Sequence, residues 1–403
     1  MKKSIIIIAL SFWVLNIFAQ EGAKYRRSSL YSMLISHPSQ TFHKEITDVF
    51  FTIPVPDKFD DHSLSVKVVS SDTKRQEDVR TINTFIEKNN IARRMVGKWF
   101  DRDPELGYFD MGLIAERGYY DASYFDISMA KMSARGTAQL ADAGEELIKN
   151  SFLIVNDIKY ADKAKRSKLI GTLVSVAGAA AAIGTGMSEI SDLANLTSGV
   201  LDQIKGFRVT VTSYLYRLDW NDEIASTLYQ DYYVDQSNFD IKKKESFDND
   251  KSLFKLTYVG KQSVASGKTS LEGINTETPE QMIRKVCTRA IDESIVELQR
   301  AHEEFRVKTP IYSSVGKAVH AKIGMKEGVT SNSKFEVLEQ SIDNNGKTQY
   351  KRVGVIKPVS GKIWDNRFMA IEEKAMNAGL EGTEFTKVSG DEFVVGMLIR
   401  EIK

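Results

Sequence analysis

The stretch GFRVTVTSYLYRLDW, residues 206–220, has the clearest strand pattern in the chain and decides the fold class. Successive side chains of a β-strand point to opposite faces, so residues two apart share a face. We therefore expect a strand of the main sheet here. Its odd-numbered face carries Phe207, Val209, Val211 and Leu215, and its even-numbered face carries Thr210, Thr212, Tyr214, Tyr216 and Leu218.

Predicted strands and helices alternate on both sides of this stretch, which favours a layered arrangement of helices on a sheet. The last of the helices has a clear start, because Thr278, Pro279 and Gln281 form a capping box with proline at the first helical position. The predicted elements are strands at 151–160 and 252–264 and helices at 78–100, 123–149 and 278–305.

The earlier part of the chain has weaker patterns. Residues 20–43 are polar and mixed, and we interpret them as a loose lead-in. Residues 48–70 are rich in Phe, Val and Ile on either side of a Pro/Asp turn, which predicts two strands. A further strand is predicted at 108–118, after Pro104 and Gly107 end the first helix.

The pattern changes after Pro310. The last part of the chain consists of short apolar runs between Gly and Asn turns, and Asn345-Gly346 is a strong hairpin signal. One short helix at 370–377 is the only candidate for helical structure there. Residues 309–403 are therefore predicted to form a small β-rich module, barrel-like in architecture.

The N-terminus has the features of an export signal. Lys2 and Lys3 precede a short apolar run from Ile5 to Val14, and Ala19 offers a cleavage point before polar sequence resumes. The predicted organisation is a signal peptide at 1–19, a mixed α/β body at 20–308 and the β-rich module at 309–403. The fold class is α+β, with a helical hairpin inserted in the body at 163–204.

The inserted hairpin contains the segment LIGTLVSVAGAAAAIGTGM, residues 169–187, which has no charged side chain. It is only just long enough to span a bilayer, and Ala and Gly favour insertion weakly. Small residues instead permit close helix packing, so the segment has three alternatives: packing on the body, packing in an oligomer, or membrane contact through 163–187, where a basic cluster precedes it. The candidate contact residues are Gly171, Ser175, Gly178, Ala179, Ala182 and Gly186.

Composition and motifs argue against several functional classes. The formal net charge is +1, from 55 Lys and Arg against 54 Asp and Glu, so bulk charge does not recruit nucleic acid. The chain contains no phosphate-binding glycine motif, no zinc motif and no nucleophile elbow, and residues 101–112 do not fit a calcium loop. The single cysteine, Cys287, is expected to be buried and inert. We therefore predict no catalytic residue, no metal and no cofactor.

Tyrosines are frequent in the body, and Tyr214, Tyr216 and Trp220 are candidates for an aromatic surface that binds a glycan or a peptide. The alternative is that these side chains belong to the sheet and its core. The pattern alone leaves both open.

Two short regions resemble known envelope proteins. The phrase AKIGMKEGVTSNSKFEVLE, residues 321–339, resembles the small β-barrel module of flagellar assembly protein T, whose turn-then-strand pattern here uses Gly324, Gly328 and Phe335. Residues 134–157 resemble a helix-then-strand unit of the curli-secretion and TolB N-terminal class. The whole chain is similar in style to uncharacterised exported proteins of Bacteroidetes. These resemblances imply assembly in the cell envelope.

Taken together, these features predict a non-catalytic protein of the periplasm or the outer-membrane surface that binds an envelope partner or itself. An oligomeric secretion or pore accessory protein that uses 169–187 is the first alternative. A hydrolase with a site built from distant carboxylates is the second. The sequence does not identify the partner or any small-molecule ligand.

Overall fold

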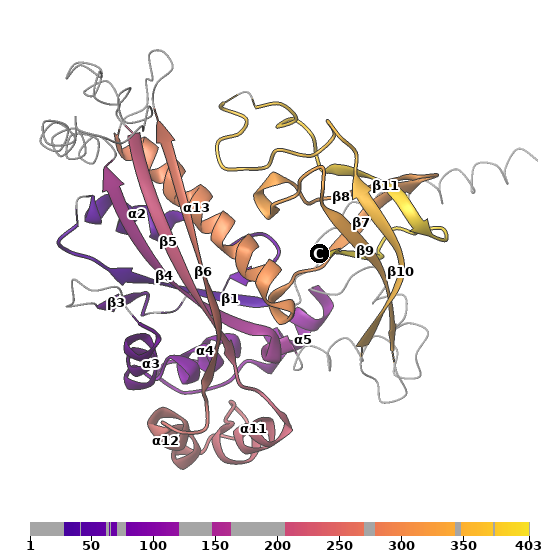
Figure 1. Cartoon of the computed structure of the whole chain (residues 1–403). Coiled ribbons are helices and arrows are strands. Elements are labelled where there is room, and N and C mark those ends of the chain that lie inside the picture. The colour runs from indigo at the N-terminus through magenta and orange to yellow at the C-terminus, as the bar shows by residue number, and fades with distance from the viewer. Residues whose placement is uncertain are drawn as a thin grey trace, which may run out of the picture.

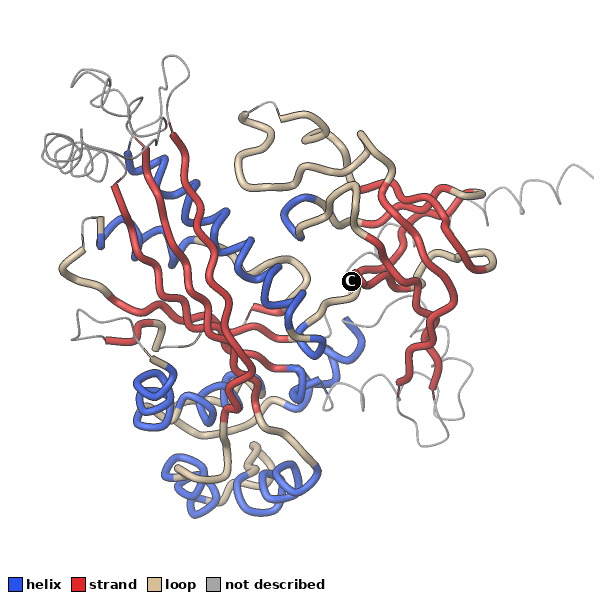
Figure 2. Tube along the Cα trace, viewed as in Figure 1, coloured by secondary structure: helices blue, strands red, loops and turns tan. Residues whose placement is uncertain are grey.

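The structure is a computed structural model that describes residues 28–40, 42–61, 64, 66–70, 78–120, 147–162, 206–269, 279–342, 348–373 and 375–402. The predicted signal peptide, the hairpin at 163–204 and nearly all of the helix at 123–149 lie outside these residues. The described chain forms a six-stranded sheet covered by helices and a separate closed barrel (Figure 1, Figure 2). The predicted α+β class is confirmed.

The main sheet has the order β2-β1-β4-β5-β6, with β3 also paired to β1. Strand β1 runs parallel to its three partners β2, β3 and β4, whereas β5 is antiparallel to both of its neighbours, β4 and β6. The predicted strands at 151–160, 206–220 and 252–264 are therefore confirmed. The strands are β1 (Ser29–Ser36), β2 (Asp60–Asp61), β3 (Val68–Ser70), β4 (Ser151–Asp162), β5 (Gly206–Leu218) and β6 (Leu256–Thr269).

Strand β1 lies inside the region that we interpreted as a loose lead-in, and that interpretation was wrong. The strand is buried on both faces: Tyr31 and Met33 face one core, and Leu30 and Leu34 face the other. Because both faces are covered, the strand lacks the apolar–polar alternation by which a half-buried strand is recognised.

The strand predicted at the start of 48–70 is also wrong, because residues His43–Thr52 form helix α2. Its buried residues are Ile46, Val49 and Phe50, spaced as on one side of a helix. Phe and Val favour strands in isolation, but burial of this side against the neighbouring helix α13 outweighs that preference.

Several short helices cover one face of the sheet. The single helix predicted at 78–100 is divided at Asn90, whose φ of 50° is left-handed, and Asp78 caps the first half as expected. The strand predicted at 108–118 is wrong, because this segment is helical. The helices on this face are α3 (Val79–Lys88), α4 (Ile91–Trp99), α5 (Met111–Tyr120), η1 (Leu147–Asn150), α11 (Asp222–Thr227), η2 (Leu228–Tyr232) and α12 (Ile241–Asn249).

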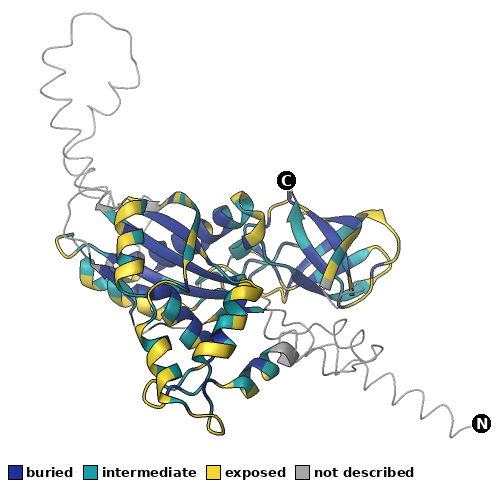
Figure 3. Ribbon diagram, turned by 90° about the horizontal axis from the view of Figure 1, so that it is seen from below, coloured by how far each residue is buried: buried dark blue, intermediate teal, exposed yellow. Residues whose placement is uncertain are grey.

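Helix α13 (Pro279–Ala301) crosses the opposite face beside α2 (Figure 1). Its predicted apolar stripe is buried from Ile283 to Leu298, although the helix ends at Ala301 and Phe305 follows in the short turn η3 (Glu303–Phe305). Figure 3 shows the buried strands of the sheet enclosed between helices whose outer sides are exposed. The sheet therefore has two cores, one on each face.

The C-terminal module is a closed barrel with the order β10-β11-β8-β7-β12-β9, as the sequence predicted. Phe335 and Phe385 meet edge to face at its centre, with ring centroids 5.1 Å apart. The described part of 370–377 forms turns instead of the predicted helix. The elements are β7 (Thr309–Val315), β8 (Ala318–Ala321), η4 (Met325–Glu327), β9 (Lys334–Ile342), β10 (Thr348–Pro358), β11 (Thr383–Gly390) and β12 (Leu398–Ile402).

The barrel contacts helix α13 closely at one turn. Arg300 donates a hydrogen bond to the carbonyl oxygen of Gly328 at 2.8 Å and pairs with Glu401. A Cβ atom at Gly328 would lie 2.6 Å from Val296 of the helix, and φ there is +77°. The second glycine of the pattern at 321–339 is thus required by the contact between barrel and helix.

Candidate binding site

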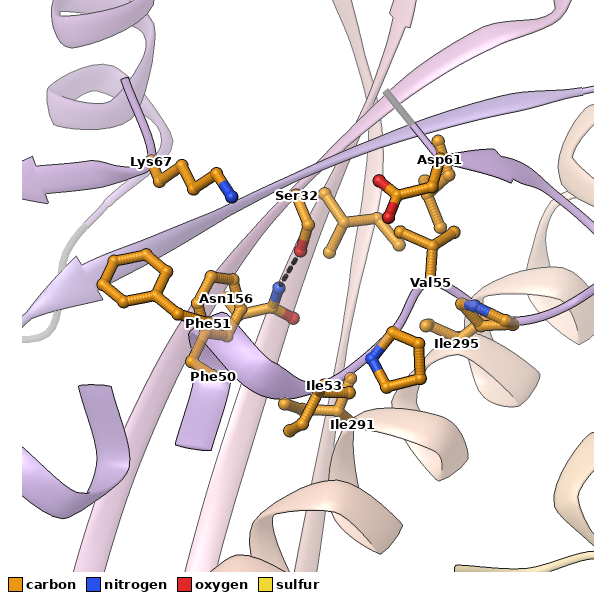
Figure 4. Close-up of a pocket in the computed structure, with 14 residues that line it drawn as sticks. Ser32, Phe50, Phe51, Ile53, Val55, Asp61, Lys67, Asn156, Ile291 and Ile295 are labelled. Atoms are coloured by element: carbon orange, nitrogen blue, oxygen red, sulfur yellow. Dashed lines mark hydrogen bonds between the residues drawn. The ribbon is translucent and has the colours of Figure 1, made fainter. Parts of the chain in front are cut away.

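A small cavity lies between α2, the segment that follows it, the sheet and α13 (Figure 4). Its volume is about 90 Å³. A water molecule occupies about 30 Å³ in the liquid, so the space equals that of a few waters. Ten of its fourteen lining residues are apolar, among them Phe50, Phe51, Ile53, Val55, Ile291 and Ile295, and polar and apolar atoms share its inner surface almost equally.

Two polar side chains from adjacent strands face this cavity. Ser32 lies on the face of β1 that also carries Leu30 and Leu34, and Asn156 lies on β4. The amide nitrogen of Asn156 donates to the Ser32 hydroxyl at 3.2 Å and to the carbonyl oxygen of Met33 at 3.4 Å. Because that carbonyl only accepts, the amide nitrogen must face β1, and Asn156 has one orientation.

The polar contacts continue away from the cavity beneath helix α13. Ser213 stands opposite Asn156 in the β4–β5 pairing and donates to its amide oxygen at 2.7 Å. The hydroxyl of Ser294 on α13 lies 2.8 Å from that of Ser213. Ser213 uses its only proton on Asn156, and the single proton of Ser294 has two acceptors in reach, the Ser213 hydroxyl and the carbonyl oxygen of Ile291, each at 2.8 Å. We call these four residues, Ser32, Asn156, Ser213 and Ser294, the polar row.

The polar row leaves the Ser32 hydroxyl free to donate. It accepts the bond from Asn156, and the described residues offer its proton no acceptor within hydrogen-bond reach. The bonds from Ser213 to Asn156 and from Asn156 to Ser32 both point toward β1, and bonds aligned in this way strengthen one another. The row therefore presents one oriented hydroxyl donor to the cavity.

Two side chains of opposite charge stand at the mouth of the cavity. Asp61 is opposite Leu30 in the β1–β2 pairing, and the backbone oxygen of Lys67 accepts from the amide of Leu34 at 2.9 Å. The ammonium of Lys67 lies 5.8 Å from the centre of the Phe51 ring. Among the residues that the structure describes, neither charged group has an ion-pair partner. Figure 4 shows them on opposite sides of Ser32.

The predicted aromatic surface is corrected by the structure. Tyr214 and Tyr216 are 0% and 1% exposed, and Trp220 is half-buried against Phe254, with ring centroids 6.4 Å apart. Their face of β5 is covered by the short helices, so these rings belong to the core. The six candidate contact residues of the hairpin lie outside the described residues.

The remaining chemically active side chains have structural roles. Cys287 is buried in the α13 core as predicted, and burial raises the pKa of its thiol to about 12. His37 lies 2.6 Å from the buried carboxylate of Asp157, which Lys159 also approaches. Burial alone would raise the pKa of Asp157, but these two contacts lower it below its ordinary value. The pair connects the end of β1 to β4.

The described residues contain neither a candidate metal site nor a candidate membrane-spanning helix. No three His, Cys, Asp or Glu side chains there are grouped so that they could hold a metal ion. No described helix has both the length and the apolar character needed to cross a bilayer.

The polar row was not predicted, although its signal is visible in the sequence. Asn156 interrupts the apolar strand at 151–160, and Ser213 interrupts the apolar face between Val211 and Leu215. A polar residue at an inward-facing strand position must find a buried partner. Asp61 and Lys67 give no such signal, because only the pairing of β2 and β3 with β1 brings them to Ser32.

No family model matches the chain, and no curated protein matches it.

Proposed function

We propose that the chain is an exported, non-catalytic protein of the cell envelope that acts by binding other envelope components. The observation that supports this most is the cavity beside the polar row. Its walls are apolar, its polar floor is held in one orientation by hydrogen bonds, and its mouth carries two charged groups without ion-pair partners among the described residues. Apolar lining residues combined with a few placed polar groups are the usual composition of a ligand site, and the cavity of about 90 Å³ restricts the ligand to a small group.

The hydrogen-bond directions also favour recognition over chemistry. A serine nucleophile needs a neighbouring base that accepts its proton. Ser32 has the opposite arrangement, because the neutral amide of Asn156 donates to it. The hydroxyl is thus oriented as a donor toward a ligand, and its proton is not withdrawn.

A crosslinking experiment tests the proposal in the cell envelope. Phe51 lines the cavity and is 43% exposed, so a photo-crosslinking amino acid at position 51 should give a discrete adduct with an envelope component. Phe239, 49% exposed and placed near α12 away from the cavity, is the matched control position. Equal adducts at both positions, or recovery of the chain only from the cytoplasm, would contradict the proposal.

The alternative role in secretion or pore formation rests on the uncharged segment at 169–187. The strands that flank it are paired to their ends, with Asp162 opposite Phe207. Deletion of 163–204 should therefore leave the body folded. If the alternative holds, the deletion lowers the mass in solution and abolishes partition into detergent. An unchanged mass and partition would reject it.

A further inference from the structure

We propose that the cavity binds a free α-amino acid with a short branched apolar side chain, such as leucine or valine. This inference deepens the proposed binding function and rests on it. The argument comes from the size of the cavity, the donor at its floor and the two charges at its mouth.

The volume restricts the apolar part of the ligand. A cavity of about 90 Å³ is smaller than the engineered apolar cavity of about 150 Å³ that holds benzene. The space between Phe50, Ile291 and Ile295 holds roughly three or four carbon atoms, so a lipid acyl chain or an indole ring would not fit inside it completely. The aliphatic and aromatic walls favour a branched hydrocarbon group by roughly 0.8 kcal/mol for each buried methylene.

One end of the site suits a carboxylate. The Ser32 hydroxyl has a proton to donate, and the ammonium of Lys67 reaches the same side of the cavity (Figure 4). A carboxylate accepts from both groups at once, and such charge-assisted hydrogen bonds are stronger than neutral ones. The Phe51 ring beneath Lys67 keeps the ammonium near the mouth.

The other end suits an ammonium group. Asp61 is held beside Leu30, and Lys67 is held beside Leu34, with Ser32 midway between them on β1. The two backbone positions are therefore roughly 13 Å apart along the strand, at about 3.3 Å per residue. A ligand with both charges can form an ion pair with Asp61 and with Lys67. A fatty acid could pair only with Lys67, and an amine only with Asp61.

Calorimetry with the mature chain, residues 20–403, tests the inference. We expect L-leucine to bind, and N-acetyl-L-leucine and L-leucinamide to bind at least about tenfold more weakly, because each lacks one charge. L-tryptophan should be weaker by a similar factor, because its ring exceeds the cavity. No heat of binding with millimolar leucine, or equal binding of leucine and leucinamide, would overturn the inference.

Two variants assign each charge to its end of the ligand. In Asp61→Asn the preference for leucine over N-acetyl-L-leucine should disappear, while the preference over L-leucinamide remains. In Lys67→Gln the preference for leucine over L-leucinamide should disappear, while the preference over N-acetyl-L-leucine remains. Asp231→Asn and Lys242→Gln, at exposed positions on the far side of the sheet, are matched controls that should leave both preferences unchanged.

The two proposals fail in different ways. An adduct at position 51 without amino-acid binding would reject this inference and keep the broader proposal. Leucine binding without any adduct would keep the ligand site and reject the envelope partner.

Discussion

The two faces of the main sheet are buried by different means. On the helix-rich face, Tyr31 and Tyr216 are buried among other aromatic rings, and their hydroxyls bond outward, to the backbone of α4 and to Asn83. On the α13 face the side chains are mostly aliphatic, and the polar row bonds to itself across three strands. The first arrangement attaches helices to the sheet, whereas the second lines a cavity.

Strand β1 shows the difference within a few residues. Tyr31 and Met33 have helices packed over them, while Ser32, between them in sequence, faces open space on the other side. Close packing on the helix-rich face stabilises the fold. On the α13 face the packing is less complete, and the polar row leaves the Ser32 hydroxyl as a hydrogen-bond donor beside the cavity. This comparison makes four predictions, described from the largest expected effect to the smallest.

The largest loss of stability should come from a substitution in the aromatic core on the helix-rich face of the sheet. Trp99 is 1% exposed and meets Phe100 edge to face at 5.0 Å. Trp99→Ala should lower the free energy of unfolding by about 3–5 kcal/mol, because it removes a large buried ring. Urea unfolding measures this, with the exposed Leu106→Ala as control. A loss below about 1 kcal/mol would show that this face is not a close-packed core.

The next effect concerns the side of α13 that faces the barrel. Asp292 is 9% exposed, and burial raises the pKa of its carboxyl from an ordinary 3.8 to about 7, with Glu327 and Asp57 adding to the rise and Lys326 opposing it. The folded chain therefore binds this proton more tightly than the unfolded chain. Its contribution to stability is complete below about pH 4 and is lost as the pH rises to about 7.

Asp292→Asn should remove this pH dependence, which amounts to about 4 kcal/mol at most at 1.36 kcal/mol per pKa unit. The variant should be more stable than the parent chain above neutral pH. Thermal unfolding across this pH range measures the effect, and Glu293→Gln, on the exposed side of the same turn, is the control. Identical pH profiles for parent and variant would refute the prediction.

A substitution in the polar row should cause an intermediate loss of free energy of unfolding. Ser213→Ala leaves the amide oxygen of the buried Asn156 without its donor, which costs about 1–3 kcal/mol. Thr257→Ala removes a hydroxyl that bonds to Asp219 at the surface and should have little effect. Chemical denaturation of the two variants compares them. Equal losses of stability would mean that the hydrogen bond between Ser213 and Asn156 is not shielded from water.

The smallest effect should come from one hydroxyl on the aromatic face. Tyr31→Phe removes the bond to the carbonyl oxygen of Met95 but keeps the ring, so the loss should be about 1 kcal/mol. A loss larger than that of Ser213→Ala would reverse the comparison between the two faces. The same denaturation experiment measures it.

Local pattern predicted the elements whose own residues carry a strong signal. Strand β5 is rich in β-branched and aromatic residues, helix α13 begins with a capping box, and the barrel contains hairpin turns. Each of these signals acts over a few residues. The pattern failed at β1 and α2, where burial on both faces or contact with α13 outweighs the local preference. The cavity could not be predicted, since Asp61 and Lys67 reach Ser32 only through parallel pairing across distant segments.

Helix α13 belongs to both halves of the molecule. Ile291 and Ile295 close the cavity, while on the same turns Arg289 bonds to the carbonyl oxygen of Phe368 at 2.9 Å and Val296 touches Gly328 of the barrel. A shift of α13 would therefore change both the cavity and the contact with the barrel. If a partner that displaces the barrel shifts this helix and so changes affinity in the cavity, reciprocity requires that an occupied cavity change affinity for that partner by the same factor.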